Sequence, residues 1–96
     1  KAASNTSGMR FAHLLPDMGN IDIYVDYIMI ISDMAYKDIS NYVLLLAGHQ
    51  SIIIKNTGTD NILLKMYNFF TNEYYYTAYI IGYYGSTELP QLLFEV

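Results

Sequence analysis

The chain contains no cysteine among its 96 residues. That absence rules out disulfide bonds, thiolate metal sites and cysteine nucleophiles. It leaves the cellular compartment open, because many bacterial secreted domains lack cysteine.

Charge is also scarce, and basic charge above all. Charged residues make up 15% of the chain, whereas a soluble domain typically has about 25%. The five Lys and Arg residues are scattered, and the formal net charge is −4. A chain of this kind is a poor candidate for binding a phosphate backbone, so no nucleic-acid partner is expected. No apolar run approaches the roughly 18 residues that span a bilayer, so no membrane insertion is expected either.

Apolar residues are abundant instead. The hydrophobic fraction is 53% of a chain that is long enough for one domain only. A domain of this size cannot easily bury so many apolar side chains, so some must lie on its surface. Surface patches of that kind commonly mark contacts with partners or subunits.

The apolar residues occur in short runs separated by turn residues, as in β-sheet proteins. Residues 21–26 alternate strictly, and Asp26-Tyr27 marks a hairpin before the next run. We predict an all-β, immunoglobulin-like β-sandwich of about seven to eight strands. Residues 1–8 are small and polar and are interpreted as a flexible N-terminal arm, so the sandwich domain is expected over 9–96. The expected strands cover 9–15, 21–26, 28–32, 39–45, 50–55, 62–70, 74–81 and 91–95.

Two stretches carry a resemblance to a known family, namely residues 10–17 (RFAHLLPD) and residues 21–26 (IDIYVD). Shorter segments agree in order at 34–36, 40–42, 46–48 and 75–82. Over nearly all of 9–96 the chain resembles the domain of unknown function 4397. The resemblance implies a β-sandwich found mostly in bacterial secreted and cell-surface proteins, and it implies no established activity.

The chain departs from the family pattern mainly at turn and small residues. Tyr27 and Lys37 stand where the family usually has glycine, and Leu15 stands where it usually has serine. Leu46 replaces a proline, and Met18 replaces a common alanine. Most of these changes introduce larger and often apolar side chains, which adds to the apolar surface.

His13 and Asp17 lie around the first turn and are the strongest candidates for site chemistry. They could form an acid–base pair or contribute metal ligands. Alternatively, the His13 ring hydrogen-bonds a turn carboxylate or the backbone and fixes the loop. We favour this structural turn role, because no third ligand or nucleophile lies at a suitable spacing. We therefore predict no catalytic, metal-binding or cofactor-binding residues, and we expect that the protein is not an enzyme.

The run from Tyr74 to Ile81 is the most strongly β-forming segment of the chain. Alternation divides it into two faces, only one of which can meet the core. We predict that Tyr76, Ala78 and Ile80 are buried. The outward residues are either ordinary sheet formers or a contact patch for a neighbouring subunit or a sugar. This candidate interaction surface comprises Tyr75, Tyr79, Ile81, Tyr83 and Tyr84.

Two functions are compatible with these features. The leading hypothesis is a non-enzymatic structural module of a bacterial extracellular, cell-surface or spore-surface assembly, which associates with copies of itself through its apolar and tyrosine-rich faces. Head-to-tail contacts, with or without the arm, would then give filaments. The alternative is a monomeric cell-surface module that binds a glycan or another surface protein. A concave patch ringed by polar groups would favour ligand binding, whereas a flat apolar stripe would favour assembly.

Overall fold

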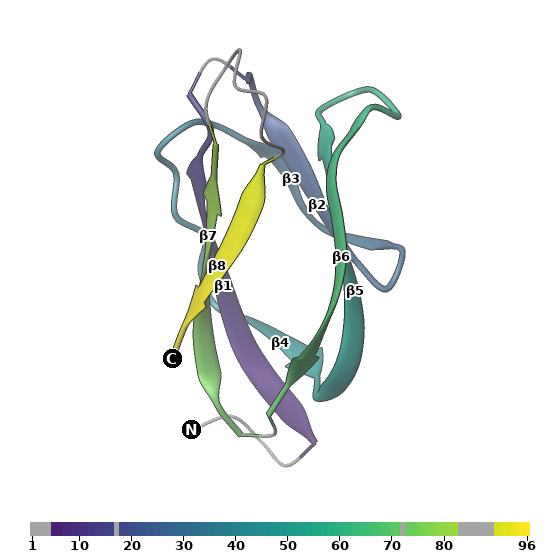
Figure 1. Ribbon diagram of the computed structural model, residues 1–96, viewed down its shortest axis with the longest axis vertical. Coiled ribbons are helices and arrows are strands. Elements are labelled where there is room, and N and C mark those ends of the chain that lie inside the picture. Colours follow the sequence, from purple (N-terminus) through teal and green to yellow (C-terminus); the bar gives the residue numbers. More distant parts are fainter. Residues whose placement is uncertain (1–4, 17, 72, 83–89) are drawn as a thin grey trace.

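The computed structural model describes residues 5–16, 18–71, 73–82 and 90–96, which form eight β-strands in two four-stranded sheets (Figure 1). Sheet A has the order β4-β1-β7-β8, and sheet B has the order β3-β2-β5-β6. The strands are β1 (Thr6–Leu14), β2 (Ile21–Val25), β3 (Ile28–Met34), β4 (Val43–Leu46), β5 (Gly48–Asn56), β6 (Ile62–Phe70), β7 (Tyr75–Ile81) and β8 (Gln91–Glu95).

The two sheets face each other across one apolar core, so the predicted all-β sandwich is confirmed. In sheet B every neighbouring pair of strands is antiparallel, whereas sheet A contains a parallel pair, β1 and β7, at its centre. The described residues include no helix that could cross a membrane.

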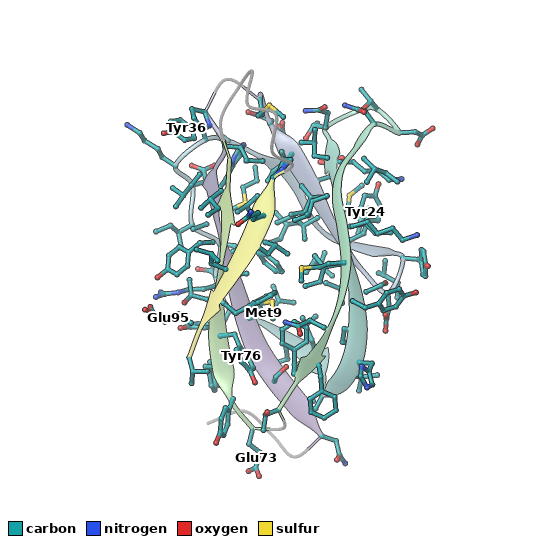
Figure 2. All side chains as sticks on the ribbon, viewed as in Figure 1. Met9, Tyr24, Tyr36, Glu73, Tyr76 and Glu95 are labelled. Atoms are coloured by element: carbon teal, nitrogen blue, oxygen red, sulfur yellow. The ribbon has the colours of Figure 1, made fainter. Side chains whose placement is uncertain are left out.

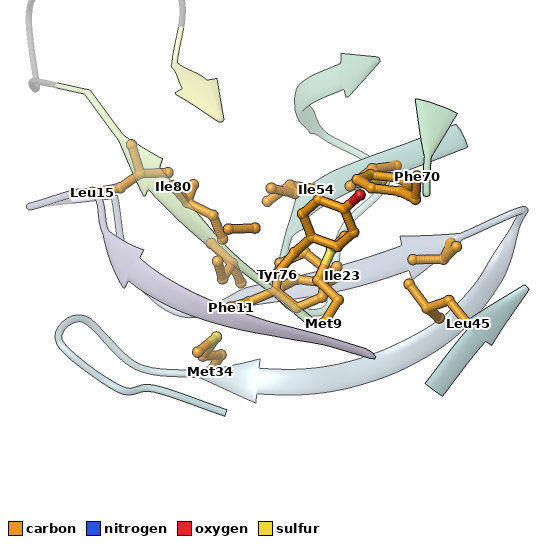
Figure 3. Close-up of a cluster of buried hydrophobic side chains, with 14 residues drawn as sticks. Met9, Phe11, Leu15, Ile23, Met34, Leu45, Ile54, Phe70, Tyr76 and Ile80 are labelled. Carbon is orange, nitrogen blue, oxygen red and sulfur yellow. The ribbon is translucent and has the colours of Figure 1, made fainter. Parts of the chain in front are cut away.

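The core is made by inward residues of both sheets (Figure 3). Tyr76, Ala78 and Ile80 of β7 are buried in it, as alternation predicts. The Phe70 ring packs edge-on against Tyr76 and Phe94, with ring centroids 5.3 and 5.2 Å apart, and so joins β6 to sheet A. The Tyr76 hydroxyl accepts a hydrogen bond from the Thr71 backbone N–H at 2.8 Å, which satisfies its polar end.

The predicted hairpin at Asp26-Tyr27 joins β2 and β3. Both residues have positive φ, 49° and 67°, as a two-residue type I′ turn requires. Lys37, in the loop after β3, also has a positive φ of 75°. Tyr27 and Lys37 therefore occupy backbone conformations that glycine adopts without strain.

Several strand boundaries differ from those predicted, and the starts of β1 and β4 differ most, by three and four residues. β1 begins at Thr6, so residues 6–8 of the expected arm belong to the sheet, and residues 1–4 lie outside the described part of the chain. β4 begins at Val43, whereas Ile39 makes only an isolated bridge to Ala12. The Ser40 hydroxyl accepts the Phe11 backbone N–H at 2.9 Å and so replaces a partner that a continued strand would supply.

Candidate interaction surface

The outer face of sheet A brings together side chains from four strands that are far apart in the sequence. Outward positions of β1 lie beside outward positions of β7, which lie beside those of β8. One row across the sheet runs from Arg10 through Thr77 to Glu95. The next row runs from Ala12 through Tyr79 to Leu93. Strands are about 4.8 Å apart, so Arg10 and Glu95 lie on backbones separated by about 10 Å.

Small residues on β1 make room for the aromatic rings of this face. A Cβ atom on Gly8 would lie only 2.7 Å from the Tyr75 ring, so this ring lies directly over the β1 backbone. The Tyr42 ring, just before β4, contacts Tyr75 edge-on at a centroid distance of 5.0 Å. The absence of a side chain on Gly8 therefore lets two tyrosines pack over the middle of the sheet.

The polar groups of the face are bonded mainly to one another. The Arg10 Nε donates a hydrogen bond to Thr77 Oγ1 at 2.9 Å, and its guanidinium lies 5.1 Å from the centre of the Tyr42 ring. The Tyr79 hydroxyl donates to Glu95 Oε1 at 3.1 Å. This hydrogen bond, with the negative charge of Glu95, raises the pKa of Tyr79 above its ordinary value and keeps the phenol neutral.

Exposed apolar side chains surround this polar centre. Leu93 on β8 is 52% exposed, and Leu44 on β4 is 59% exposed. Ile39, which bridges to Ala12, is 64% exposed. Figure 2 shows Glu95 projecting from sheet A on the opposite side of the molecule from Tyr24 of sheet B, with Met9 and Tyr76 between the sheets. We call the set Arg10, Tyr42, Leu44, Tyr75, Thr77, Tyr79, Leu93 and Glu95 the tyrosine face.

The predicted patch is only partly represented in this face. Tyr75, Tyr79 and Ile81 point outward from β7 and are half-buried by their neighbours. Tyr83, Tyr84 and Asp17 lie outside the described residues. Sequence reasoning missed members that come from β8, from β1 and from the segment before β4. Alternation along β1 is a signal that could have predicted an outward Arg10. No sequence signal predicts that β1 pairs with β7, which brings Arg10 beside Thr77.

His13 lies at the inward face of β1 and is fully buried. Its Nε2 lies 2.8 Å from the Gly19 carbonyl oxygen, and its Nδ1 accepts the Leu15 backbone N–H at 3.1 Å. Nδ1 is therefore the unprotonated nitrogen, and Nε2 donates to Gly19. Both ring nitrogens are thus committed to the backbone of the β1–β2 connection, which leaves neither for proton transfer with a substrate. The predicted structural role of His13 rests on these contacts.

Within the described residues, no three His, Cys, Asp or Glu side chains lie close enough to hold a metal ion. A comparison of the sequence with known protein families gives a match over nearly the whole sandwich. The sequence model of the family DUF4397, a domain of unknown function, matches residues 7–95. The chain belongs to this family. No curated protein matches this DUF4397 domain significantly. The match begins at Ser7, inside β1, so it covers every described strand of the sandwich nearly in full.

Proposed function

We propose that this DUF4397 domain is a non-enzymatic structural module that associates with a second copy of itself through the tyrosine face. We propose further that it does so outside the cell, on a bacterial surface or spore surface. The observation that carries the proposal is the tyrosine face itself, where exposed leucines and the exposed Tyr42 lie beside the half-buried Tyr75 and Tyr79, and the polar groups are already bonded to one another.

Paired polar groups favour a protein partner over a small ligand. A ligand site normally offers a few convergent donors and acceptors that fix the ligand's orientation. On the tyrosine face the Arg10 guanidinium is bonded to Thr77, and the Glu95 carboxylate is bonded to Tyr79. The remaining exposed area is mainly apolar and aromatic, which is the composition of the centre of a protein–protein interface.

The positions of the two charges favour a second copy as the partner. Arg10 and Glu95 lie in one row on either side of Thr77. A two-fold axis that runs along β7, in the plane of the interface, would place Arg10 of each copy opposite Glu95 of the other. The face is therefore self-complementary in charge, as a two-fold symmetric interface requires.

A charge-exchange experiment tests this arrangement. We expect Arg10→Glu and Glu95→Arg each to weaken self-association at least about tenfold, because each places like charges opposite one another. Mixing the two variants in equal amounts should restore association, since every opposed pair then has opposite signs. Sedimentation velocity over a range of concentrations gives the masses, and circular dichroism checks that both variants fold.

Two outcomes would contradict the proposal. If the variants associate as well separately as the wild type does, the tyrosine face is not the contact. If the wild type is a monomer at every concentration, intrinsic self-association is excluded. Glycan binding through the 45% exposed ring of Tyr42 then becomes the function to test, by calorimetry with Tyr42→Ala as the control.

A further inference from the structure

Sheet B ends on both sides in strands that pair on one side only within the described part of the chain, namely β3 and β6. Such edges expose backbone N–H and C=O groups and can template pairing with another chain. β6 has nine residues and contains no proline, and its side chains Ile62, Tyr67 and Phe69 are exposed. We infer that β6 of one copy adds to β3 of the next and so extends sheet B head to tail into a filament.

Strand direction is the first reason to choose these two edges. β3, β2, β5 and β6 alternate in direction, because each neighbouring pair is antiparallel. The two edge strands therefore run in opposite directions. A copy translated along the sheet, without inversion, would lay its β3 antiparallel to β6, so the strand directions would keep alternating, although β3 itself pairs with β2 through two register shifts. The contact would be heterologous, and a repeat that does not close into a ring gives a filament.

Sheet A does not offer the same continuation. Its central pair, β1 and β7, is parallel, whereas the outer pairs are antiparallel. The edge strands β4 and β8 consequently run in the same direction. The same translation would place them side by side as a parallel pair, which is slightly less stable per residue.

Charge is the second reason. Two exposed acidic residues lie near the ends of β3, Asp26 in the hairpin before it and Asp33 close to its C-terminal end. The Asp26 carboxylate accepts a hydrogen bond from neutral Ser51, and the Asp33 carboxylate accepts one from neutral Asn20. The β6 edge carries Lys65, also exposed. Asp60, in the turn before β6, is paired with Lys55 at 3.8 Å. The two acidic groups near the ends of β3 thus lie at one side of sheet B and Lys65 lies at the other, which makes the two edges complementary.

The register brings these charges near each other in the extended sheet. Lys65 pairs with Ile53, Ile53 with Tyr24, and Tyr24 with Met29, so Lys65 and Met29 lie in one row. In an in-register extension Lys65 would lie beside Met29 of the next copy, between that copy's two acidic residues. The flexible lysine stem could approach either carboxylate within the Debye length of about 8 Å at physiological salt.

Apolar surface at the β3 side is the third reason. There the sandwich opens into an apolar cleft of 180 Å³ between β3 and β4. At its rim, Ile28 and Leu46 are each 68% exposed. The opposite side is closed by the contact between Phe70 and Phe94. A copy seated on β3 would cover the cleft and remove these side chains from water.

The test compares two charge reversals of equal size. Lys65→Glu changes the β6 edge, whereas Lys37→Glu makes the same change in the loop after β3, on neither edge strand. We expect the wild type and Lys37→Glu to form long particles, while Lys65→Glu needs at least about tenfold more protein to reach the same mean mass. Light scattering and negative-stain microscopy measure particle mass and shape, and thermal unfolding checks that both variants fold.

The inference rests on the proposed function only in that copies of the domain associate, and the outcomes separate the two. Dimers of Lys65→Glu beside filaments of the wild type support both contacts. Monomers of Lys65→Glu support the edge contact and overturn the tyrosine face as an independent one. Lys65→Glu particles as long as those of the wild type overturn the edge contact. A wild type that stops at dimers also overturns the edge contact but leaves the tyrosine face standing. A wild type that stays monomeric overturns both.

Discussion

The two sheets of this domain have equal numbers of strands but present different outer surfaces. Sheet A carries tyrosines and leucines around a single arginine and a single glutamate, which are bonded to Thr77 and Tyr79. Sheet B carries its exposed charges near its edges, with Asp33 on β3 and Lys65 on β6. The same strand alternation therefore builds a self-complementary face in one sheet and two complementary edges in the other.

Strand direction explains part of this difference. The parallel pair of β1 and β7 lies at the centre of sheet A and joins chain segments from opposite ends of the sequence. The outward rows of sheet A consequently bring together residues whose proximity cannot be predicted from local sequence patterns. Sheet B is built of antiparallel neighbours throughout, so its edges differ in direction as well as in charge. The comparison predicts that changes in sheet A alter packing and face-to-face contact, whereas changes at the edges of sheet B alter extension.

The two histidines, one in each sheet, give the largest expected difference in stability. His13→Ala should lower the free energy of unfolding by about 2–4 kcal/mol, because it leaves backbone groups at Leu15 and Gly19 without partners and opens a cavity. His49→Ala, at an exposed site beside Phe69, should change it by less than about 0.5 kcal/mol. Urea unfolding measures both. Equal, small effects would show that His13 does not hold the β1–β2 connection.

Gly8 tests whether the tyrosine face depends on close approach to the β1 backbone. Gly8→Ala should cost about 1–3 kcal/mol, because the new methyl group would lie 2.7 Å from the Tyr75 ring and must displace it. In a Tyr75→Ala background the same substitution should cost much less. A double-mutant cycle from urea unfolding gives this coupling directly. An equal cost in both backgrounds would mean that Tyr75 is not what excludes a side chain at this position.

The sequence predicts the strands of this fold well and their partners poorly. Alternation along 75–81 identified Tyr76, Ala78 and Ile80 as core residues, and Asp26-Tyr27 identified the hairpin. Both signals are local. Arg10 and Glu95 share a row only because β7 lies between β1 and β8, a pairing between distant segments that hydrophobic periodicity does not encode. The start of β4 was misplaced for a local reason, since the Ser40 hydroxyl takes over a backbone hydrogen bond.

Substitutions by glycine at turn residues with positive φ should have a smaller effect on the free energy of unfolding, and this effect should be stabilising. Lys37→Gly should raise the free energy of unfolding by about 1 kcal/mol, because Lys37 has a φ of 75° that disfavours a side chain. Lys37→Ala, which keeps the Cβ atom, is the matched control and should bring no such gain. Tyr27→Gly in the sheet B hairpin should gain less, since it also removes the Tyr27 side chain that interacts with Tyr67 and raises the pKa of Tyr67. Thermal unfolding ranks the three variants, and an equal gain from Lys37→Ala would exclude backbone strain as the cause.

The smallest expected effect is a difference in titration between Tyr79 of sheet A and Tyr67 of sheet B. The hydrogen bond to Glu95 raises the pKa of Tyr79, so the stabilisation it provides is complete below the ordinary pKa of about 10. That stabilisation is lost as pH rises through the higher pKa of the folded protein. Glu95→Ala should therefore lower the pKa of Tyr79, while Tyr67 of sheet B keeps its own raised pKa because Tyr27 is its main hydrogen-bond partner.

Phenolate absorbance during an alkaline titration measures this, and subtracting the curve of Tyr79→Phe from that of the wild type isolates Tyr79. If the same subtraction in the Glu95→Ala background gives an unchanged curve, the hydrogen bond does not control the ionisation of Tyr79. Glu95 would then be free to pair with Arg10 of a second copy without first releasing Tyr79. A lowered pKa would mean instead that Glu95 controls the ionisation of Tyr79, and pairing of Glu95 with Arg10 of a second copy should then lower the pKa of Tyr79 as well.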